Sequence, residues 1–403
     1  MNDRWRDRLG QVLREGVHRR EVLAGLGLAL PVAASLSRFP VEESEAKNRN
    51  KQKRKRRRNT KQQRRKAKVS LKVMSRNIYL GADLAPLFTV TTLPELIAAG
   101  TALFATVQET DFPARAKLLA AEIIKEEPDI VGLQEVSYWR TQTPSDGNPT
   151  PNAEDVVYDF LTTLLDELVT QGGQYEAVVS VNNFDGEIPI QGTSGLIDLR
   201  LTDRDVILAR SGTSRNSVAI SNATSGNFAT NAVIPNPVLG DITILRGWTA
   251  VDVKRKHVTT RVVNTHLEAI APPIQEAQGA ELLAGPLQTD LPTVLLGDLN
   301  SGAYGGGTPG QTQTPTYQNM LDAGFVDAWP NGRAQGESYT CCQAEDLMNE
   351  DSLLSERIDF VLTRGSITAK DAERLGADSD VRTPSGLWTS DHAGVSAHLR
   401  VKR

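Results

Sequence analysis

Short apolar runs that end in polar, reactive side chains recur along this chain. The clearest is Val294–Leu296, which is followed by Gly297, Asp298, Leu299 and Asn300. In an extended backbone successive side chains alternate between faces, so Asp298 and Asn300 point to one side while Leu299 points into the core. A strand end that presents a carboxylate and an amide together can position a metal ion or a water molecule. An ordinary turn is the competing interpretation, because Asp and Asn also favour turns.

Four further stretches have the same design: Val73–Asn77, Ile130–Glu135, Val262–His266 and Arg357–Val361. A fifth, Ser390–His392, precedes the final strand-like segment. Together the six stretches resemble the endonuclease/exonuclease/phosphatase superfamily, the DNase I-like metal-dependent phosphodiesterases. The resemblance covers residues 69–400, and the ordered set is more specific than any single stretch.

The resemblance implies an α/β fold, a four-layer α/β sandwich in which two packed mixed β-sheets are flanked by helices. The spacing of apolar residues predicts helices over Pro113–Lys125 and Glu154–Thr170. The composition of Asn182–Leu199 predicts a loop-rich insertion, and that of Gly302–Gln313 predicts a glycine-rich loop beside the site.

Hydrolysis of a phosphodiester requires charge neutralisation at phosphorus, an activated water and help for the leaving oxygen. Mg²⁺ suits this work because it prefers a few carboxylates plus waters; Mn²⁺ and Ca²⁺ are alternatives. The resemblance implies that Glu135 holds the metal, with Asn77 near metal and phosphate and Asp391 as a further metal contact. A surface glutamate and a capping asparagine are the structural alternatives for the first two.

Asp298 and Asn300 match the family's pair that positions and deprotonates the attacking water. His266 and His392 each end one of the stretches, and as imidazolium or donor either can stabilise charge on the phosphate. Asp359 is expected to orient and charge His392. A single histidine is more often structural, and an ion pair with the adjacent Arg357 is the alternative for Asp359.

The predicted phosphate-binding set is Asn77, Asn300, His266 and His392. Two positions fit the family pattern less closely. Arg76 stands where an aromatic or small residue is usual, and it either supplies positive charge to the phosphate or faces outward. Asp205 lies in a region where family members place further phosphate contacts, and its match is loose.

Cys341 and Cys342 are the only cysteines, and they are adjacent. No zinc-type spacing exists, so a structural Cys/His metal site is not expected. Two partly buried thiols are the expected state, with a vicinal disulfide or a pairing between chains as alternatives in an exported protein.

The first part of the chain has the pattern of an export signal. Arg19 and Arg20 precede an uncharged stretch, Val22–Ser37, whose 16 residues are short for a membrane span. Within this stretch, Val32–Ala34 offers small residues where a signal peptidase could cut. We expect a bacterial twin-arginine signal over residues 1–40 and an extracellular or cell-surface protein. A buried or amphipathic helix is the alternative.

Charge is distributed unevenly. Residues 1–46 are neutral overall and residues 47–68 carry 14 basic and no acidic side chains, so the remainder carries −18 against −4 for the whole chain. We expect a basic, disordered linker over residues 41–68, whose segment Lys47–Lys68 could contact an anionic surface, and a catalytic domain over residues 69–403. No stable protein partner is inferred.

These expectations define a secreted, Mg²⁺-dependent phosphoesterase whose substrate is a phosphodiester of nucleic acid or of a phospholipid headgroup. An extracellular nuclease is the first choice. A sphingomyelinase-like or other lipid or small-molecule phosphodiesterase or phosphatase is the alternative, since an acidic body matches a long polyanion poorly. A binding protein on an inactive scaffold is the third interpretation.

Overall fold

The computed structural model describes residues 49–58, 68–148, 150–212, 218–303, 314–330 and 334–402. The chain divides into two compact units, Met1–Thr60 and Lys61–Arg403. The predicted export signal and most of the loop Gly302–Gln313 lie outside the described residues. Among the helices that are described, none combines the length and the apolar composition needed to cross a membrane.

Residues 49–58 form a helix in which every residue is exposed. The disordered linker predicted from composition therefore contains a helical stretch that buries no apolar surface. Lys and Arg are good helix formers, a preference that the prediction, based on burial, did not weigh. The boundaries of the three predicted segments stay predictions.

The larger sheet is mixed and has the strand order β15-β16-β1-β2-β6-β3-β4, with β5 paired to β6. In chain order its strands are β1 (Lys68–Asn77), β2 (Ile130–Gln134), β3 (Tyr138–Gln142), β4 (Asp155–Asp159), β5 (Tyr175–Gly192), β6 (Gly195–Arg210), β15 (Ile367–Leu375) and β16 (Gly394–Lys402). Strand β1 runs parallel to β2 and antiparallel to β16.

The second sheet has the order β13-β14-β12-β11-β10-β7. Its strands are β7 (Ala219–Asn227), β10 (Gly247–Arg255), β11 (Val258–His266), β12 (Thr293–Asp298), β13 (Val326–Asp327) and β14 (Asp359–Arg364). A separate hairpin consists of β8 (Ala232–Asn236) and β9 (Gly240–Ile244).

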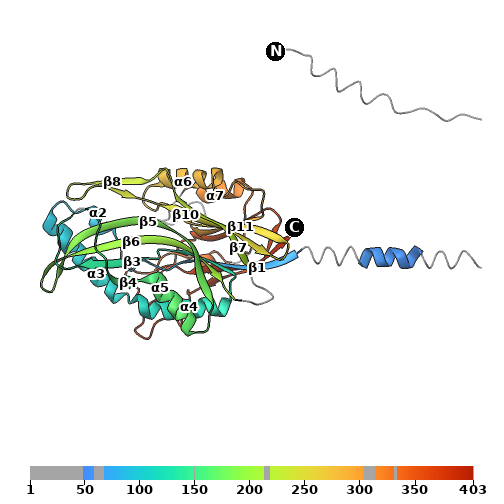
Figure 1. Ribbon diagram of the computed structural model, residues 1–403, viewed down its shortest axis with the longest axis horizontal. Helices are drawn as coiled ribbons and strands as arrows, with labels where there is room; N and C mark the ends of the chain where they lie inside the picture. The colour runs from blue at the N-terminus through green and yellow to red at the C-terminus, as the bar shows by residue number, and fades with distance from the viewer. Residues whose placement is uncertain are drawn as a thin grey trace, which may run out of the picture. The chain divides into compact units, whose positions relative to one another are not determined.

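The two sheets pack face to face and helices cover their outer faces (Figure 1). Branched side chains from both sheets, such as Val73, Val262 and Leu296, form one buried cluster between them. Helices α3 (Leu93–Glu109), α4 (Phe112–Glu126) and α5 (Phe160–Thr170) pack on the larger sheet, and α6 (Pro272–Ala284) and α7 (Thr316–Asp322) on the second. The remaining helices are α2 (Ala85–Phe88) and the 3₁₀ turn Gln335–Ser338. The predicted four-layer sandwich is confirmed.

The helix predicted over Glu154–Thr170 is wrong in its first part, because Asp155–Asp159 is strand β4. Val156 and Val157 are β-branched and favour strands, and β4 pairs with β3 along this stretch. The helix begins only at Phe160, where the side chain of Asp159 caps it by accepting the N–H of Leu161.

The loop-rich insertion predicted over Asn182–Leu199 is also wrong. The stretch belongs to a long hairpin in which β5 and β6 pair from Tyr175 and Arg210 to the turn at Gly192 and Gly195. A register shift between Asn182 and Phe184 interrupts the alternation of inward and outward side chains. Because β5 pairs with only one neighbour, it also tolerates polar residues that weaken a strand signal.

Candidate active site

Three neighbouring strands of the second sheet carry polar side chains to one edge. His266 on β11 lies opposite Asp298 on β12, and Asp298 lies opposite Asp359 on β14. Gly297 makes this approach possible, because it has φ +147 and a Cβ there would lie 2.1 Å from the carbonyl oxygen of Thr265. The glycine before Asp298 is therefore required by the packing of two parallel strands.

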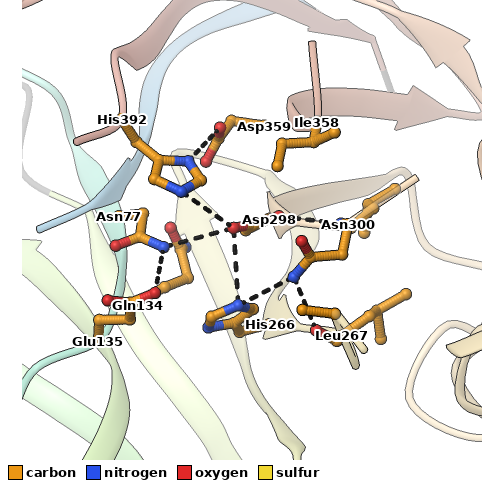
Figure 2. Close-up of polar contacts among 12 residues, drawn as sticks. Asn77, Gln134, Glu135, His266, Leu267, Asp298, Asn300, Ile358, Asp359 and His392 are labelled. Carbon is orange, nitrogen blue, oxygen red and sulfur yellow. Dashed lines mark hydrogen bonds and ion pairs between the residues drawn. The ribbon is translucent and has the colours of Figure 1, made fainter. Parts of the chain in front are cut away.

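The larger sheet supplies Asn77 and Glu135 from the ends of β1 and β2 (Figure 2). Asn77 Nδ2 donates to Glu135 Oε1 at 2.9 Å and to Asp298 Oδ2 at 3.3 Å. The N–H of Tyr79 donates to Asn77 Oδ1 at 3.0 Å, which fixes the amide orientation. In this orientation Asn77 presents donors to the two carboxylates, and its oxygen is already used.

Asp298 lies at the centre of the site. Its Oδ1 accepts the N–H of Asn300 at 2.9 Å, and its Oδ2 lies 3.6 Å from His266 Nε2 and 3.7 Å from His392 Nε2 (Figure 2). Burial, reinforced by the negative charge of Asp359, raises the pKa of Asp298 to about 7. A carboxylate with such a pKa can accept a proton near neutral pH.

His392 is paired with Asp359, whose Oδ2 lies 2.8 Å from His392 Nδ1. Arg357, the alternative partner for Asp359, instead forms an ion pair with Asp327 at 2.5 Å. Burial by itself lowers the pKa of His392, but the charges of Asp359 and Asp391 outweigh it and raise that pKa well above its usual value. His392 is therefore an imidazolium at neutral pH, with Nε2–H directed towards Asp298.

His266, in contrast to His392, is neutral. Burial lowers its pKa well below the usual value, and the positive charges of Arg246 and His392 add to that effect. Arg246 Nη1 lies 3.0 Å from His266 Nδ1. A guanidinium can only donate, so Nδ1 accepts and the proton of the neutral ring lies on Nε2, which faces Asp298. Asn300 Nδ2 donates to the carbonyl of Leu267, and its 3.1 Å approach to Nε2 is not a hydrogen bond in this tautomer because both groups are donors.

Sequence reasoning missed Arg246. It immediately precedes strand β10, outside any of the six stretches, and only the tertiary structure brings it beside His266. The expectations for Arg76 were wrong, because its buried side chain neither faces outward nor reaches the site. It donates to the carbonyl of His392 and to Thr389 Oγ1, and it pairs with Glu122 at 3.2 Å. Arg76 thus holds the segment that carries His392 against β1.

The sulfur atoms of Cys341 and Cys342 lie against each other, the arrangement of the vicinal disulfide that the sequence left as an alternative. Their adjacency in the chain brings the two sulfur atoms together without closing a long loop. Cys341 is buried and pairs through its backbone with His392, while Cys342 lines the cavity that holds Glu135.

Residues 102–392 match the model of the Endonuclease/Exonuclease/phosphatase family. The chain belongs to this family. Its members hydrolyse phosphoester bonds, act on phosphodiester substrates such as DNA, and usually employ a divalent metal ion. Among curated proteins, none matches the chain.

Two solved structures of proteins from this family share the fold, and a third solved structure is similar in part. A family protein from Bacteroides thetaiotaomicron is 16% identical, with a TM-score of 0.51 over 83% of this chain and 99% of that one. One from Bacteroides vulgatus is also 16% identical, with a TM-score of 0.50 over 83% of this chain and 100% of that one. A mannosyl-6-phosphatase from Bacteroides thetaiotaomicron is 17% identical, with a TM-score of 0.48 over 82% of this chain and 99% of that one.

The residues present fit the metal that the family usually binds. Glu135 and Asp391 line one cavity of about 340 Å³. Burial and the charge of Glu135 raise the pKa of Asp391 to about 6. A cation bound between the two carboxylates would stabilise their charged forms. Carboxylate oxygens are the ligands that Mg²⁺ prefers. The ligand atoms of Asp298, Asp359 and His392 also lie within 4.8 Å of one another, but His392 and Asp359 already bond to each other.

Asp205 is fully buried and, like Asp298 and both histidines of the site, does not line the cavity of Glu135 and Asp391. Asp203, two residues earlier on β6, does line it. Burial, with the charge of Asp203, raises the pKa of Asp205 well above its usual value, and burial raises that of Asp203 to about 7. Both carboxyl groups therefore keep their protons to a higher pH in the folded protein than in the unfolded chain.

We expect the thermal stability of the metal-free protein to fall as pH rises from 4 towards 8. A carboxyl whose pKa is raised on folding keeps a proton that the unfolded chain has lost, so stability decreases between the unfolded and the folded pKa. Asp205→Asn imitates the protonated form and should raise Tm at pH 8 by about 2–4 °C or more while changing it little at pH 4. Asp155→Asn, at an exposed position, is the control; a parental slope in Asp205→Asn contradicts the assignment.

Arg246→Met should lower kcat by roughly 10-fold or more, the typical loss for one hydrogen bond to a charged group. Without the guanidinium, the pKa of His266 should rise, and the loss should therefore be greatest at low pH, where the ring gains a second proton. The pH profile of kcat and the NMR titration of His266 measure both effects. Arg400→Met, at an exposed position on β16, is the matched control. An unchanged His266 titration in Arg246→Met rules the role out.

Proposed function

We propose that this protein is a metal-dependent phosphodiesterase that uses Mg²⁺ to activate water. The observation that carries the proposal is the convergence on Asp298 Oδ2 of Asn77 Nδ2 at 3.3 Å and of two histidine Nε2 atoms at 3.6 and 3.7 Å. Neutral His266 and cationic His392 thus flank one buried carboxylate. Such an arrangement can bind a phosphate and deprotonate a water beside it.

In the proposed reaction the oxygen of water bonds to phosphorus and the bond from phosphorus to the leaving alcohol breaks. Asp298 accepts the proton of the attacking water, positioned by Asn300, whose N–H donates to Asp298 Oδ1. The Nε2–H groups of His392 and His266 stabilise the charge on the phosphoryl oxygens. The leaving oxygen takes a proton from solvent, to which Asp298 then returns the proton it accepted. When bound by Glu135 and Asp391, Mg²⁺ supplies positive charge and acidifies water.

Asp359 and Arg246 each contact the Nδ1 atom of one histidine, whose Nε2 atom faces Asp298. Asp359 keeps His392 protonated and fixes its ring through the 2.8 Å contact. Arg246 keeps His266 neutral and directs its proton to Nε2. The two histidines are therefore held in different protonation states, a cation on one side of Asp298 and a neutral donor on the other.

The test is a screen of Mg²⁺-dependent turnover with bis(p-nitrophenyl) phosphate, DNA, RNA and sphingomyelin, each with and without EDTA. We expect hydrolysis of the chromogenic diester that EDTA abolishes and Mg²⁺ restores. Asp298→Asn should be inactive on every substrate. Turnover that persists in EDTA or in Asp298→Asn counts against the proposal.

Nucleic acid and lipid remain the two candidate substrates. A specific observation favours the lipid or small-molecule class. Of the described residues that line the cavity at Glu135, only Arg246 is a Lys or Arg, whereas six are Asp or Glu: Asp83, Glu135, Asp203, Glu268, Glu345 and Asp391. A duplex or long single strand needs several cations along its path.

We also propose export through the twin-arginine pathway, which rests on the sequence of residues 1–40 alone. Fractionation of cells that express the whole chain tests it. The protein should leave the cytoplasm, and replacement of Arg19 and Arg20 by lysine should retain it inside. Equal export of the double variant contradicts the twin-arginine route.

A further inference from the structure

An apolar groove adjoins the cavity that Glu135 and Asp391 line, which we call the catalytic cavity. This groove has a volume of about 380 Å³ and lies between α2, the hairpin β5–β6 and the hairpin β8–β9. It shares Leu84, Phe88 and Phe184 with the cavity that holds Glu135 and Asp391. The two hollows are therefore neighbours, and these three apolar side chains form their common border.

The lining of the apolar groove is hydrocarbon and aromatic. Beyond the three shared residues it includes Leu87, Leu103, Trp139, Leu199, Leu201 and Leu239. Within the described part of the chain no Lys or Arg lines it, and the charged lining residues are Asp185, Glu187 and Asp241. A second phosphate of a polyanion would meet negative charge there, so the groove suits an uncharged chain.

The walls of the groove are held in place. Asn236, at the end of β8, directs its amide to the carbonyl oxygens of Leu87, Phe88 and Val90, at 3.5, 3.4 and 3.2 Å. Its Oδ1 accepts the N–H groups of Val238 and Leu239. The hairpin β8–β9 is thus tied both to α2 and to its own turn, and the groove exists before any ligand binds.

The mouth is also apolar. Leu239 at the groove and Leu245 and Ile270 at the catalytic cavity are exposed, at 37%, 36% and 57%. Exposed apolar side chains that border a concave site are typical of a surface that receives an apolar ligand. The shared border with the cavity of Glu135 and Asp391 selects the ligand, because a chain attached to a phosphate in that cavity can extend into the groove.

We propose that the substrate is an amphiphilic phosphoester whose phosphate lies in the cavity of Glu135 and Asp391 and whose hydrocarbon chain occupies the apolar groove. The proposal rests on the proposed function and adds the substrate class to it. Its chemistry predicts that affinity and turnover depend on the length of the chain, since each buried methylene leaves water. A nucleic acid would bring a further phosphate with each nucleotide, which the acidic residues of the groove disfavour.

The test uses p-nitrophenyl phosphodiesters of methanol, butanol and octanol, each below its aggregation concentration, with saturating Mg²⁺ and the whole chain. Release of p-nitrophenol gives kcat/KM. We expect roughly a fourfold increase for each methylene that becomes buried. Leu239→Glu places a charge at the groove and should flatten this dependence. Val233→Glu, 53% exposed on the same hairpin but lining neither cavity, should keep the parental dependence.

Calorimetric binding of octyl phosphate and of inorganic phosphate provides a second measurement that needs no turnover. Tighter binding of octyl phosphate, lost in Leu239→Glu, supports the groove even if the diesters are not cleaved and the proposed function fails. Turnover of the methyl ester without any dependence on chain length overturns the inference and leaves the proposed function standing. A preference for DNA over all three esters also overturns it.

Discussion

Glu135→Gln is expected to weaken Mg²⁺ binding and to reduce kcat by roughly 10²–10³-fold, while the protein stays folded. Both carboxylate oxygens of Glu135 accept hydrogen bonds, Oε1 from Asn77 Nδ2 at 2.9 Å and Oε2 from Leu80 N–H at 2.8 Å. An amide can accept with its oxygen only, so its NH₂ group must face one of these two donors. The variant therefore loses a negative charge and disturbs Asn77, which also contacts Asp298.

Calorimetric titration with Mg²⁺ and steady-state kinetics measure the two effects. Glu176→Gln, an exposed position on β5, provides the matched control and should behave as the parent. The melting temperature in EDTA should stay close to the parental value, because Glu135 lies at the cavity and not in an apolar core. If Glu135→Gln binds Mg²⁺ and turns over like the parent, Glu135 is not the metal ligand.

The second large effect concerns the two histidines. His266→Ala and His392→Ala should each lower kcat by roughly 10²-fold or more, and the double variant by less than the product of the two losses. Non-additivity follows from geometry, since both Nε2 atoms lie within 3.7 Å of the same oxygen of Asp298. His257→Ala, at an exposed turn, is the control. Full additivity would mean that the two rings act on separate events.

Stability separates the two single variants. His392→Ala leaves the fully buried carboxylate of Asp359 without its partner, so it should also lower the melting temperature. Kinetics must therefore be measured well below that temperature. A variant that melts early yet keeps parental turnover would make His392 a structural residue.

Asp359→Asn should resemble a milder His392→Ala with a characteristic pH dependence. Because the charge of Asp359 helps to raise the pKa of His392, its loss lowers that pKa. The imidazolium then loses its proton at a lower pH than in the parent. The activity of Asp359→Asn should consequently decline earlier on the alkaline side, and NMR titration of His392 should show the same shift.

The sequence by itself determined the local design of the site. An apolar run that ends in Gly-Asp-Leu-Asn predicts a buried strand, and the parallel register of this strand with β11 places Asp298 beside His266. Asn300 reaches the same site through a turn and not through strand alternation, because β12 ends at Asp298, Asn300 has φ +46, and its N–H donates to Asp298 Oδ1. The same reasoning from apolar runs predicted the strand ends at Asn77 and Glu135, and the ordered set of stretches predicted the fold. These features are recoverable because each depends on residues a few positions apart.

Only the tertiary structure decided the features that depend on distant residues. Nothing around Arg246 marks it, and it meets His266 because β10 pairs with β11 so that Gly247, the next residue, lies opposite His266. The charge of Arg76 was visible in the sequence, but its burial against the His392 carbonyl was not. The long β5–β6 hairpin escaped detection because a register shift breaks its alternation, and the apolar groove that this hairpin helps to form escaped with it. Strand periodicity is a local property, whereas protonation states, ion pairs and cavities arise from contacts between segments far apart in the chain.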